Sequence, residues 1–411
     1  MTGLRYGTPE EAGMSPERVR HLAALCEGWV AEGVTTALSV LVARRGVIVL
    51  HDAWGKTSHE RDAPAVTRET VFPIGSGTKP VTATVVMQLV EDGLLGLNRP
   101  VQDYIPEFTG EGKEAVLVHH LLTHTSGLNE MDLLAHVGRK TGVAPVLGGQ
   151  RTTVMSRSEI LEARYDAPLS KRPGETMSYC NLNYALLGEI VQRASGRTLA
   201  DVARETVFTP LGMTDTDYIL PDERVSRLVR RPPGAPFPFM NRIEQFRVGL
   251  GQGGVTSTAH DMARFGQIFL DGGRGDDARI LSTATVREMT RNQIPGISAI
   301  FPDGSHVPEG SWSYGWAIFG GGKWKYYAPT LCSPHTLVHP GAGGFGMWAD
   351  PVAEIVGVYC SVLLEQVGGV LPRWSFDLFA DAVTAAATDG EPLVERRPIA
   401  PLRARQALPA G

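Results

Sequence analysis

The sequence lacks the long apolar segments that mark membrane proteins and secreted precursors. No stretch reaches the about 18 consecutive apolar residues that a membrane-spanning helix needs. The N-terminus, MTGLRYGTPEEAGMSPERVRHLAAL, has no basic leader followed by an apolar run. We therefore expect a cytoplasmic protein without a membrane partner.

The chain also lacks an excess of charge of either sign. Lys and Arg number 39 against 44 Asp and Glu, which gives a formal net charge of -5, and no long run of one sign occurs. Binders of nucleic acid or anionic membranes carry a concentrated basic surface, which this composition does not supply. We expect a small-molecule substrate and no nucleic-acid partner, whereas the oligomeric state is unknown.

Cysteine is scarce, and the four that occur stand far apart, at Cys26, Cys180, Cys332 and Cys360. They form no C-x-x-C pair and no Cys/His cluster with the spacing of a metal site. We expect free thiols in a reducing compartment, no metal and no other cofactor.

What the chain has is the composition of a large globular core: 411 residues, of which 43% are hydrophobic and 20% charged. Regular patterns then divide it. Strand-like runs lie at 37–43, 47–50, 314–319, 336–339, 346–349 and 355–363, and a final helix is expected at about 374–388. The middle of the chain has helical periodicity, including a helix that ends at Gly196, and a Pro-rich loop over 231–239.

Strands near both ends with helices between them predict an α+β fold. We expect residues 1–75 and 250–411 to form a sheet lobe with an antiparallel sheet flanked by helices. Residues 76–249 would form an inserted, mainly α-helical lobe, with the active site between the two.

Ser76-Gly77-Thr78-Lys79 places a hydroxyl and an amine three residues apart at the start of a predicted helix. This spacing puts both side chains on one face within hydrogen-bonding reach, so a neutral amine there can take the serine proton. The alternative is that Ser76 only caps the helix and Lys79 is solvated.

Tyr179-Cys180-Asn181 is the only Y-x-N in the chain. A phenol near an ammonium group is a candidate proton shuttle, and an amide two residues along can hydrogen-bond a substrate carbonyl. The alternative is a tyrosine that merely packs against the following helix.

His339-Pro340-Gly341 ends a predicted strand in small residues, which lets a substrate lie along its edge. The backbone N–H of Ala342, together with that of Ser76, is a candidate oxyanion hole. The alternative for His339 is a purely structural histidine.

Aromatic residues gather around this third motif. They are Trp312, Tyr314, Trp316, Trp324, Tyr326, Tyr327, Phe345 and Trp348. Ordinary packing is one explanation. We favour a substrate-binding wall that includes Trp316, Phe345 and Trp348.

Together these motifs resemble the serine β-lactamase-like superfamily, in the branch of class C β-lactamases, D-alanyl-D-alanine carboxypeptidases, D-aminopeptidases and family VIII carboxylesterases. The resemblance covers about residues 10–385. It is carried by VFPIGSGTKPVTA, HHLLTHTSGL, PGETMSYCNLNYALLGEIV, PLGMTDT, GQGGVTSTAHDMARF and HPGAGGFGMWADP.

The resemblance implies a β-lactamase/transpeptidase-like fold and a role for each motif residue. Ser76 would be the acylated nucleophile, Lys79 its activating partner and Tyr179 the proton exchanger, while Asn181 would contact the substrate. His339 stands where β-lactamases carry the lysine of Lys-Thr-Gly, so a permanent cation for a substrate carboxylate is missing. His124, within HHLLTHTSGL, is interpreted as structural.

These observations favour a serine hydrolase of carboxylesterase type that acts on a small-molecule ester through an acyl-Ser76 intermediate. The alternative is an acyltransferase or transacylase of the same fold that passes the acyl group to an amine or alcohol. A β-lactamase or D-amino peptidase is disfavoured because the chain shows no export signal. A non-catalytic relative is disfavoured by the intact Ser76, Lys79 and Tyr179.

We predict that Ser76→Ala abolishes turnover with little loss of stability. The hydroxyl is required for covalent catalysis, whereas its capping contribution is only about 1 kcal/mol. Ester hydrolysis and thermal unfolding of the two proteins would check this. An alanine variant that keeps about a tenth of the wild-type rate would show that the nucleophile lies elsewhere.

Overall fold

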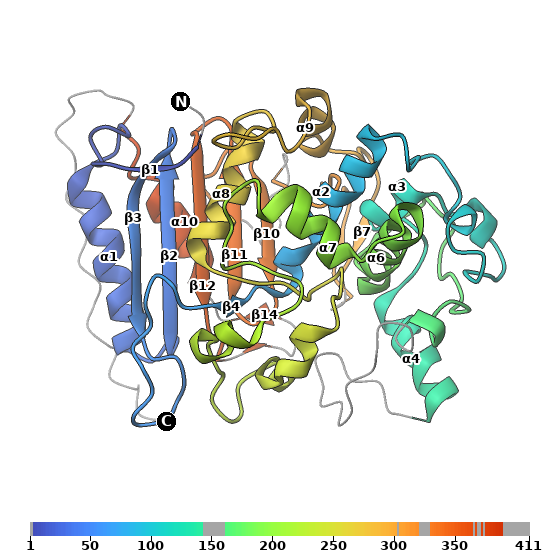
Figure 1. The fold of residues 1–411 in the computed structure, drawn as a ribbon, viewed down its shortest axis with the longest axis horizontal. Coiled ribbons are helices and arrows are strands. Elements are labelled where there is room, and N and C mark those ends of the chain that lie inside the picture. The colour runs from blue at the N-terminus through green and yellow to red at the C-terminus, as the bar shows by residue number, and fades with distance from the viewer. Residues whose placement is uncertain are drawn as a thin grey trace.

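The structure is a computed structural model that describes residues 3–142, 161–301, 304–319, 329–364, 366–367, 371–372 and 375–388. Its centre is a seven-stranded sheet in the order β1-β3-β2-β12-β11-β10-β9 (Figure 1). The strands are β1 (Arg5–Tyr6), β2 (Ala37–Arg44), β3 (Val47–Gly55), β9 (Ala317–Ile318), β10 (Leu337–Gly341), β11 (Phe345–Asp350) and β12 (Ile355–Ser361).

The two ends of the chain meet in this sheet. Strand β2 pairs with β12 in antiparallel register from Arg44↔Ile355 to Leu38↔Ser361, while β1 joins the edge strand β3 in parallel. The predicted hairpin over 37–50 is confirmed as β2 and β3, and the later strands lie where the alternation placed them. The expected strand over 314–319 is shorter, because only Ala317–Ile318 pair.

Helices cover both faces of the sheet (Figure 1). Helix α8 (Ala259–Leu270) packs on β2, β11 and β12, whereas α1 (Pro16–Ala31) and α10 (Phe376–Thr384) pack together on the opposite face. Because both faces are covered, every residue of β2, β11 and β12 is buried. Alternate residues of each strand therefore enter two separate cores.

The middle of the chain is mainly helical, as predicted, and lies beside the sheet. Its described α-helices are α2 (Thr78–Glu91), α3 (Val118–Leu122), α4 (Glu130–Thr141), α6 (Asn181–Ser195) and α7 (Leu199–Ala203). Helix α6 ends at Gly196, whose φ of 72° suits glycine. The α+β fold is thus confirmed, whereas the division into lobes at residues 75 and 250 stays a prediction.

Short elements connect these layers. They are β4 (Phe72–Pro73), η1 (Gly75–Gly77), η2 (Val101–Asp103), η3 (Lys113–Ala115), β5 (Met177–Ser178), η4 (Arg204–Phe208), η5 (Asp222–Arg227), η6 (Pro238–Asn241), η7 (Ile243–Arg247), β6 (Thr256–Ser257), α9 (Thr283–Met289), β7 (Ala299–Ile300), β8 (His306–Val307), β13 (Gln366–Val367) and β14 (Leu371–Pro372). The Pro-rich segment 231–239 is irregular up to the start of η6, as expected.

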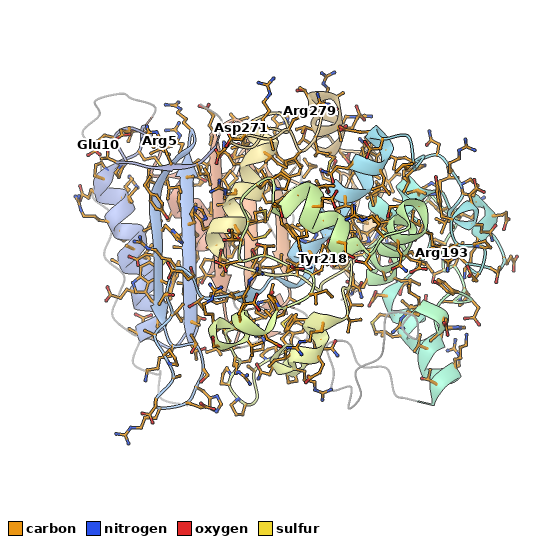
Figure 2. The ribbon with its side chains drawn as sticks, viewed as in Figure 1. Arg5, Glu10, Arg193, Tyr218, Asp271 and Arg279 are labelled. Atoms are coloured by element: carbon orange, nitrogen blue, oxygen red, sulfur yellow. The ribbon has the colours of Figure 1, made fainter. Side chains whose placement is uncertain are left out.

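Helix α2 is anchored to the segment between α7 and β6 by a buried tyrosine. The hydroxyls of Tyr218 and Thr82 lie 2.7 Å apart, and Thr82 also donates to the carbonyl of Gly251. Tyr218 is 0% exposed, and Figure 2 labels it near the middle of the view, with Arg5 toward the end of the molecule that bears α1. This anchor ties α2 to the segment that leads into the site described below.

The structure also bears on the cysteines and on membrane insertion. All four cysteines are buried free thiols, as expected. In the described residues, no helix has the length and apolarity that crossing a membrane requires.

We predict that Gly357→Ala lowers the free energy of unfolding by about 1 to 3 kcal/mol, the cost of overpacking a core. Gly357 of β12 lies under the ring of Trp348, and an added Cβ would stand 2.0 Å from the Cη2 atom of that ring. Urea unfolding monitored by fluorescence would measure the change.

Gly28→Ala is the matched control, because a Cβ at that position of α1 meets nothing within 4 Å. Its stability should be unchanged or up to about 1 kcal/mol higher. Equal stability of the Gly357 variant and the wild type would contradict the packing of Trp348.

Candidate active site

Ser76 lies on the short turn η1, directly before α2. It is the one residue between 70 and 87, all of them described, that is not buried. Its side chain does not cap the helix: the N-cap of α2 is Gly77, which makes no side-chain cap. Ser76 is thus the single polar group that this buried segment presents toward solvent.

Lys79 is fully buried and holds its amine at the serine hydroxyl. The Nζ atom lies 3.0 Å from Ser76 Oγ, 3.0 Å from Asn181 Oδ1 and 2.9 Å from the backbone carbonyl oxygen of Gln252, and it donates to each of them. A solvated lysine is thereby excluded. The three partners come from three distant segments of the chain.

Burial lowers the pKa of Lys79 to about 7, and the Glu130 carboxylate opposes this shift. A substantial fraction of the amine is therefore neutral at neutral pH. Carbonyl oxygens accept but cannot donate, so the two protons of the neutral amine point to Asn181 and Gln252. The lone pair is left facing Ser76, where it can take the hydroxyl proton.

Tyr179 and Asn181 lie at the junction between β5 and α6. The Lys79 amine stands 4.8 Å from the centre of the Tyr179 ring. Asn181 uses its Oδ1 atom for Lys79 and one Nδ2 proton for Glu130, 3.2 Å away. The second Nδ2 proton stays available, so the predicted contact with a substrate carbonyl remains a proposal.

His124 holds this junction in place. Its Nδ1 atom accepts from the backbone N–H of Cys180 at 3.2 Å and from Asn183 Nδ2 at 3.1 Å, so the ring proton resides on Nε2. Its own carbonyl accepts from the N–H of Ser178. These contacts on both sides of Tyr179 give His124 the structural role inferred from the sequence.

His339 lies on β10, fully within the structure, at 1% exposure. Its Nδ1 atom donates to the carbonyl of Pro340 at 2.7 Å, which leaves Nε2 as a bare acceptor. Burial, aided by the Lys79 charge, lowers the pKa of His339 to about 3. His339 is therefore a neutral imidazole and supplies no cation.

Strand β10 presses directly against the nucleophile turn. A Cβ on Gly341 would stand 2.0 Å from the carbonyl oxygen of Ile74, and a Cβ on Gly75 would stand 2.9 Å from the nitrogen of Ala342. Only glycine permits this approach at either position. The predicted oxyanion pair, the N–H groups of Ser76 and Ala342, belongs to these abutting segments and remains a proposal.

The predicted aromatic wall is not built from the three residues named for it. Trp316 is 0% exposed and packs on Phe269 with ring centres 5.1 Å apart. Phe345 lies under Gly77 in the core. Trp348 points to the opposite face of the sheet, where it packs on Phe376.

The physical reason is strand alternation: neighbours on β11 face opposite sides, and both sides are covered by helices. Trp312 is the aromatic residue of this segment that meets the site, since its ring centre lies 5.1 Å from that of His124, 5.9 Å from that of Tyr179 and 5.7 Å from that of His339. Trp324, Tyr326 and Tyr327 lie outside the described residues.

Three groups that contact the site residues were not predicted from the sequence: the Glu130 side chain, the Gln252 carbonyl and the Arg231 side chain. The buried Arg231 donates to the carbonyls of Gly343 and Leu363 and so braces the turn after β10. Gln252 lies within the family phrase GQGGVTSTAHDMARF, but nothing in the sequence marks its carbonyl, Glu130 or Arg231 as part of the site. An acidic residue at a helix start is ordinary, a backbone carbonyl leaves no trace in composition, and Arg231 lies in a Pro-rich segment.

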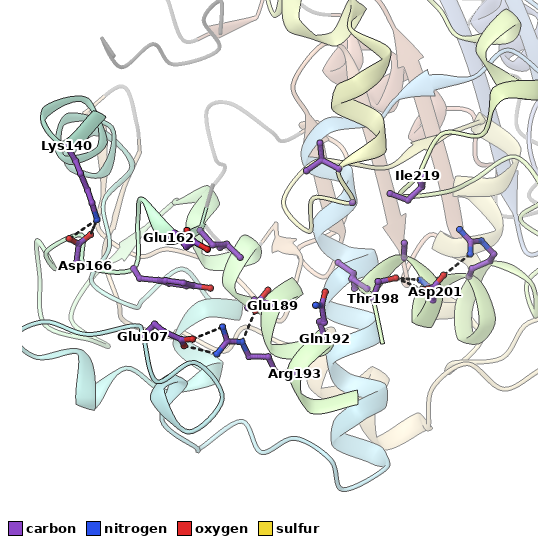
Figure 3. A pocket seen from close by; sticks show the side chains of 17 residues that line it. Glu107, Lys140, Glu162, Asp166, Glu189, Gln192, Arg193, Thr198, Asp201 and Ile219 are labelled. Atoms are coloured by element: carbon purple, nitrogen blue, oxygen red, sulfur yellow. Dashed lines mark hydrogen bonds and ion pairs between the residues drawn. The ribbon is translucent and has the colours of Figure 1, made fainter. Parts of the chain in front are cut away.

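A depression of about 1100 Å³ lies apart from this site, along α6 and α7 (Figure 3). None of the predicted site residues lines it. Two ion pairs lie in its lining, Arg193 with Glu107 and Lys140 with Asp166. The predicted site residues gather around Ser76 and not in this depression. Among the described residues, no group of three or more His, Cys, Asp or Glu is placed to hold a metal.

A partly exposed serine, a buried lysine one helical turn on, and an adjoining tyrosine and asparagine form an arrangement typical of serine hydrolases. The chain matches the family model described as Beta-lactamase over residues 22–374. The chain therefore belongs to the Beta-lactamase family.

The proteins similar to this chain include a penicillin-binding protein and esterases. The chain is 31% identical over 363 residues to "Penicillin-binding protein 4" of Amycolatopsis lactamdurans, covering 86% of each. It is 37% identical over 183 residues to "Esterase EstB" of Burkholderia gladioli, covering 44% of this chain and 46% of that one. A solved family VIII carboxylesterase superposes with a TM-score of 0.70 at 22% identity, covering 92% of this chain and 98% of that chain, which supports the fold.

We predict that activity rises with pH through about 7, because deprotonation of Lys79 creates the base. Lys79→Arg should leave a folded protein with an activity loss of at least about 100-fold, since a guanidinium cannot deprotonate. The measurement is a pH profile of ester hydrolysis for both proteins.

Lys113→Arg is the matched control, because Lys113 is also buried and donates to the backbone carbonyls of Thr109 and Tyr165. That variant should keep its activity. Near-normal turnover in the Lys79 variant, with an unchanged profile, would remove Lys79 from the mechanism.

Proposed function

We propose that this protein is a carboxylesterase-type hydrolase that cleaves a small-molecule ester through an acyl-Ser76 intermediate. The observation that carries the proposal is the neutral, buried His339 at the strand beside the nucleophile. The penicillin and peptide substrates of relatives carry a carboxylate, and a neutral imidazole offers it no charge-assisted hydrogen bond. An uncharged ester does not need one.

The first half-reaction forms the acyl-enzyme. Ser76 Oγ attacks the ester carbonyl carbon while its proton passes to the neutral Lys79 amine, and the N–H groups of Ser76 and Ala342 stabilise the oxyanion. The tetrahedral intermediate then collapses, the C–O bond to the alcohol breaks, and the proton returns to the leaving oxygen through Lys79 or Tyr179.

The second half-reaction releases the acid. Water attacks the acyl carbonyl and gives one proton to the Lys79 and Tyr179 pair, and Ser76 regains a proton as it leaves. The 37% sequence identity to "Esterase EstB" over 183 residues supports hydrolysis of an ester by this mechanism. Transfer of the acyl group to an amine or alcohol would use the same groups, so the acceptor must be determined by experiment.

We predict that p-nitrophenyl butyrate is hydrolysed at least about 10-fold faster, in kcat/KM, than p-nitrophenyl hemisuccinate. A carboxylate that enters without a cationic partner loses hydration that no charge-assisted hydrogen bond replaces, and a cost of about 1.4 kcal/mol already corresponds to a tenfold difference. The assay is run with and without added primary amines, and mass spectrometry identifies the products.

The outcomes separate the candidate functions. Acid as the sole product supports the esterase, whereas a new amide identifies an acyltransferase. A β-lactam such as nitrocefin that is turned over faster than the neutral ester would overturn the proposal.

A further inference from the structure

Glu130, the first residue of α4, hydrogen-bonds to Asn181, which in turn contacts Lys79. Its carboxylate accepts from the backbone N–H of Asn181 at 2.7 Å and from Asn181 Nδ2 at 3.2 Å. The preceding residue, Asn129, caps α4 and donates from Nδ2 to Ser178 Oγ at 3.2 Å. The start of α4 is therefore bonded to the chain on both sides of Tyr179.

The carboxylate decides which way the Asn181 amide points. An ionised carboxylate accepts hydrogen bonds and donates none, so Asn181 must turn its NH2 group toward Glu130. The Oδ1 atom is then left facing Lys79, where it accepts at 3.0 Å. In the reverse orientation the NH2 group would meet the Lys79 ammonium, donor against donor.

Glu130 also supplies charge to a site that otherwise has little. The groups around Lys79 are the Ser76 hydroxyl, the Asn181 amide, the Gln252 carbonyl, the rings of Tyr179 and Tyr184, and more distantly His124, His339 and Cys180. Burial lowers the pKa of both histidines and raises the pKa of the Cys180 thiol, so all three are neutral at pH 7.

Among the described residues, Glu130 is thus the carboxylate whose charge favours the protonated form of Lys79. This attraction works against the burial of the amine. Removing the charge should therefore let Lys79 lose its proton at lower pH.

We propose that Glu130 is a positioning residue for acylation: through Asn181 it fixes the acceptor that faces Lys79, and its charge sets the pH range in which Lys79 activates Ser76. The inference rests on the proposed function, because it takes Lys79 as the base for Ser76. It assigns a role to a residue outside the three motifs.

The test measures how fast a fluorophosphonate labels Ser76, as a second-order rate constant across the neutral pH range. This readout reports activation of the nucleophile without requiring the natural substrate. In Glu130→Gln the rising limb of the profile should move to lower pH by about 0.5 to 1 unit, because a negative charge near Lys79 is lost.

Asp132→Asn is the matched control. Asp132 lies on the same first turn of α4, is exposed, and accepts from Ser170 Oγ at 2.6 Å rather than from Asn181. In Asp132→Asn the labelling rate should rise over the same pH range as in the wild type. An equal shift in both variants would mean that any charge on α4 acts alike, which would overturn the specific role of Glu130.

Glu130→Asp separates charge from geometry. The charge is kept, so the limb should stay in place, but the shorter side chain cannot reach both N–H groups of Asn181. The rate constant at high pH should then fall about 3- to 10-fold, as expected for the loss of one hydrogen bond. If Glu130→Gln does not fold, Glu130→Asp alone tests the inference. An unchanged labelling rate constant at high pH in Glu130→Asp would then overturn it.

The two levels of the proposal fail differently. Labelling of the wild type at a serine other than Ser76, or none at all, would reject the proposed function and the inference with it. Labelling at Ser76 with the same pH limb in the wild type and in Glu130→Gln would reject the inference alone.

Discussion

The burial of one amine organises this molecule. Lys79 is withdrawn from water on α2, and a buried ammonium or amine needs hydrogen-bonding partners to compensate for lost hydration. Those partners are Ser76, Asn181 and the carbonyl of Gln252, from a turn, a helix start and a loop far apart in the chain. The hydrogen bonds of the Lys79 amine therefore form only when all three of these segments are correctly placed. The same burial lowers the pKa of Lys79 to about 7, so the need for partners and the proton affinity that the proposed mechanism requires have a single cause.

The rest of the site is held by close backbone approach and by positioning contacts. Gly75 and Gly341 let β10 abut the nucleophile turn without intervening side chains. Arg231 braces the following turn through the carbonyl of Gly343, while His124 and Glu130 secure the segment that bears Tyr179 and Asn181. Ser76, Tyr179 and Asn181 are partly exposed, whereas Lys79 is buried together with His124 and Arg231. These contacts hold Ser76 against Lys79 in the geometry that the proposed acyl transfer requires.

Local patterns carried most of what could be predicted. The hairpin of β2 and β3, the end of α6 at Gly196 and the pairing of Ser76 with Lys79 all depend on residues close in sequence, where periodicity and turn chemistry act directly. The joint occurrence of the three motifs also pointed to the family that the comparison shows. The aromatic wall failed because composition near a motif does not reveal which face of a strand each residue occupies. Trp348 and Met347 are neighbours in sequence and lie in different cores.

The amino-acid sequence by itself determined the α+β class and the central strands, because these are written in periodicity and alternation, and its motifs predict the nucleophile and the side chains expected to serve it. Only the tertiary structure decided that Lys79 is wholly buried, that His339 is a neutral acceptor and that Glu130 faces Asn181. Burial and proton affinity depend on every atom that surrounds a group, and those atoms come from segments more than a hundred residues apart, as in the contact between Lys79 and Asn181, where |i−j| is 102. No local pattern encodes such an environment. It exists once the chain has folded.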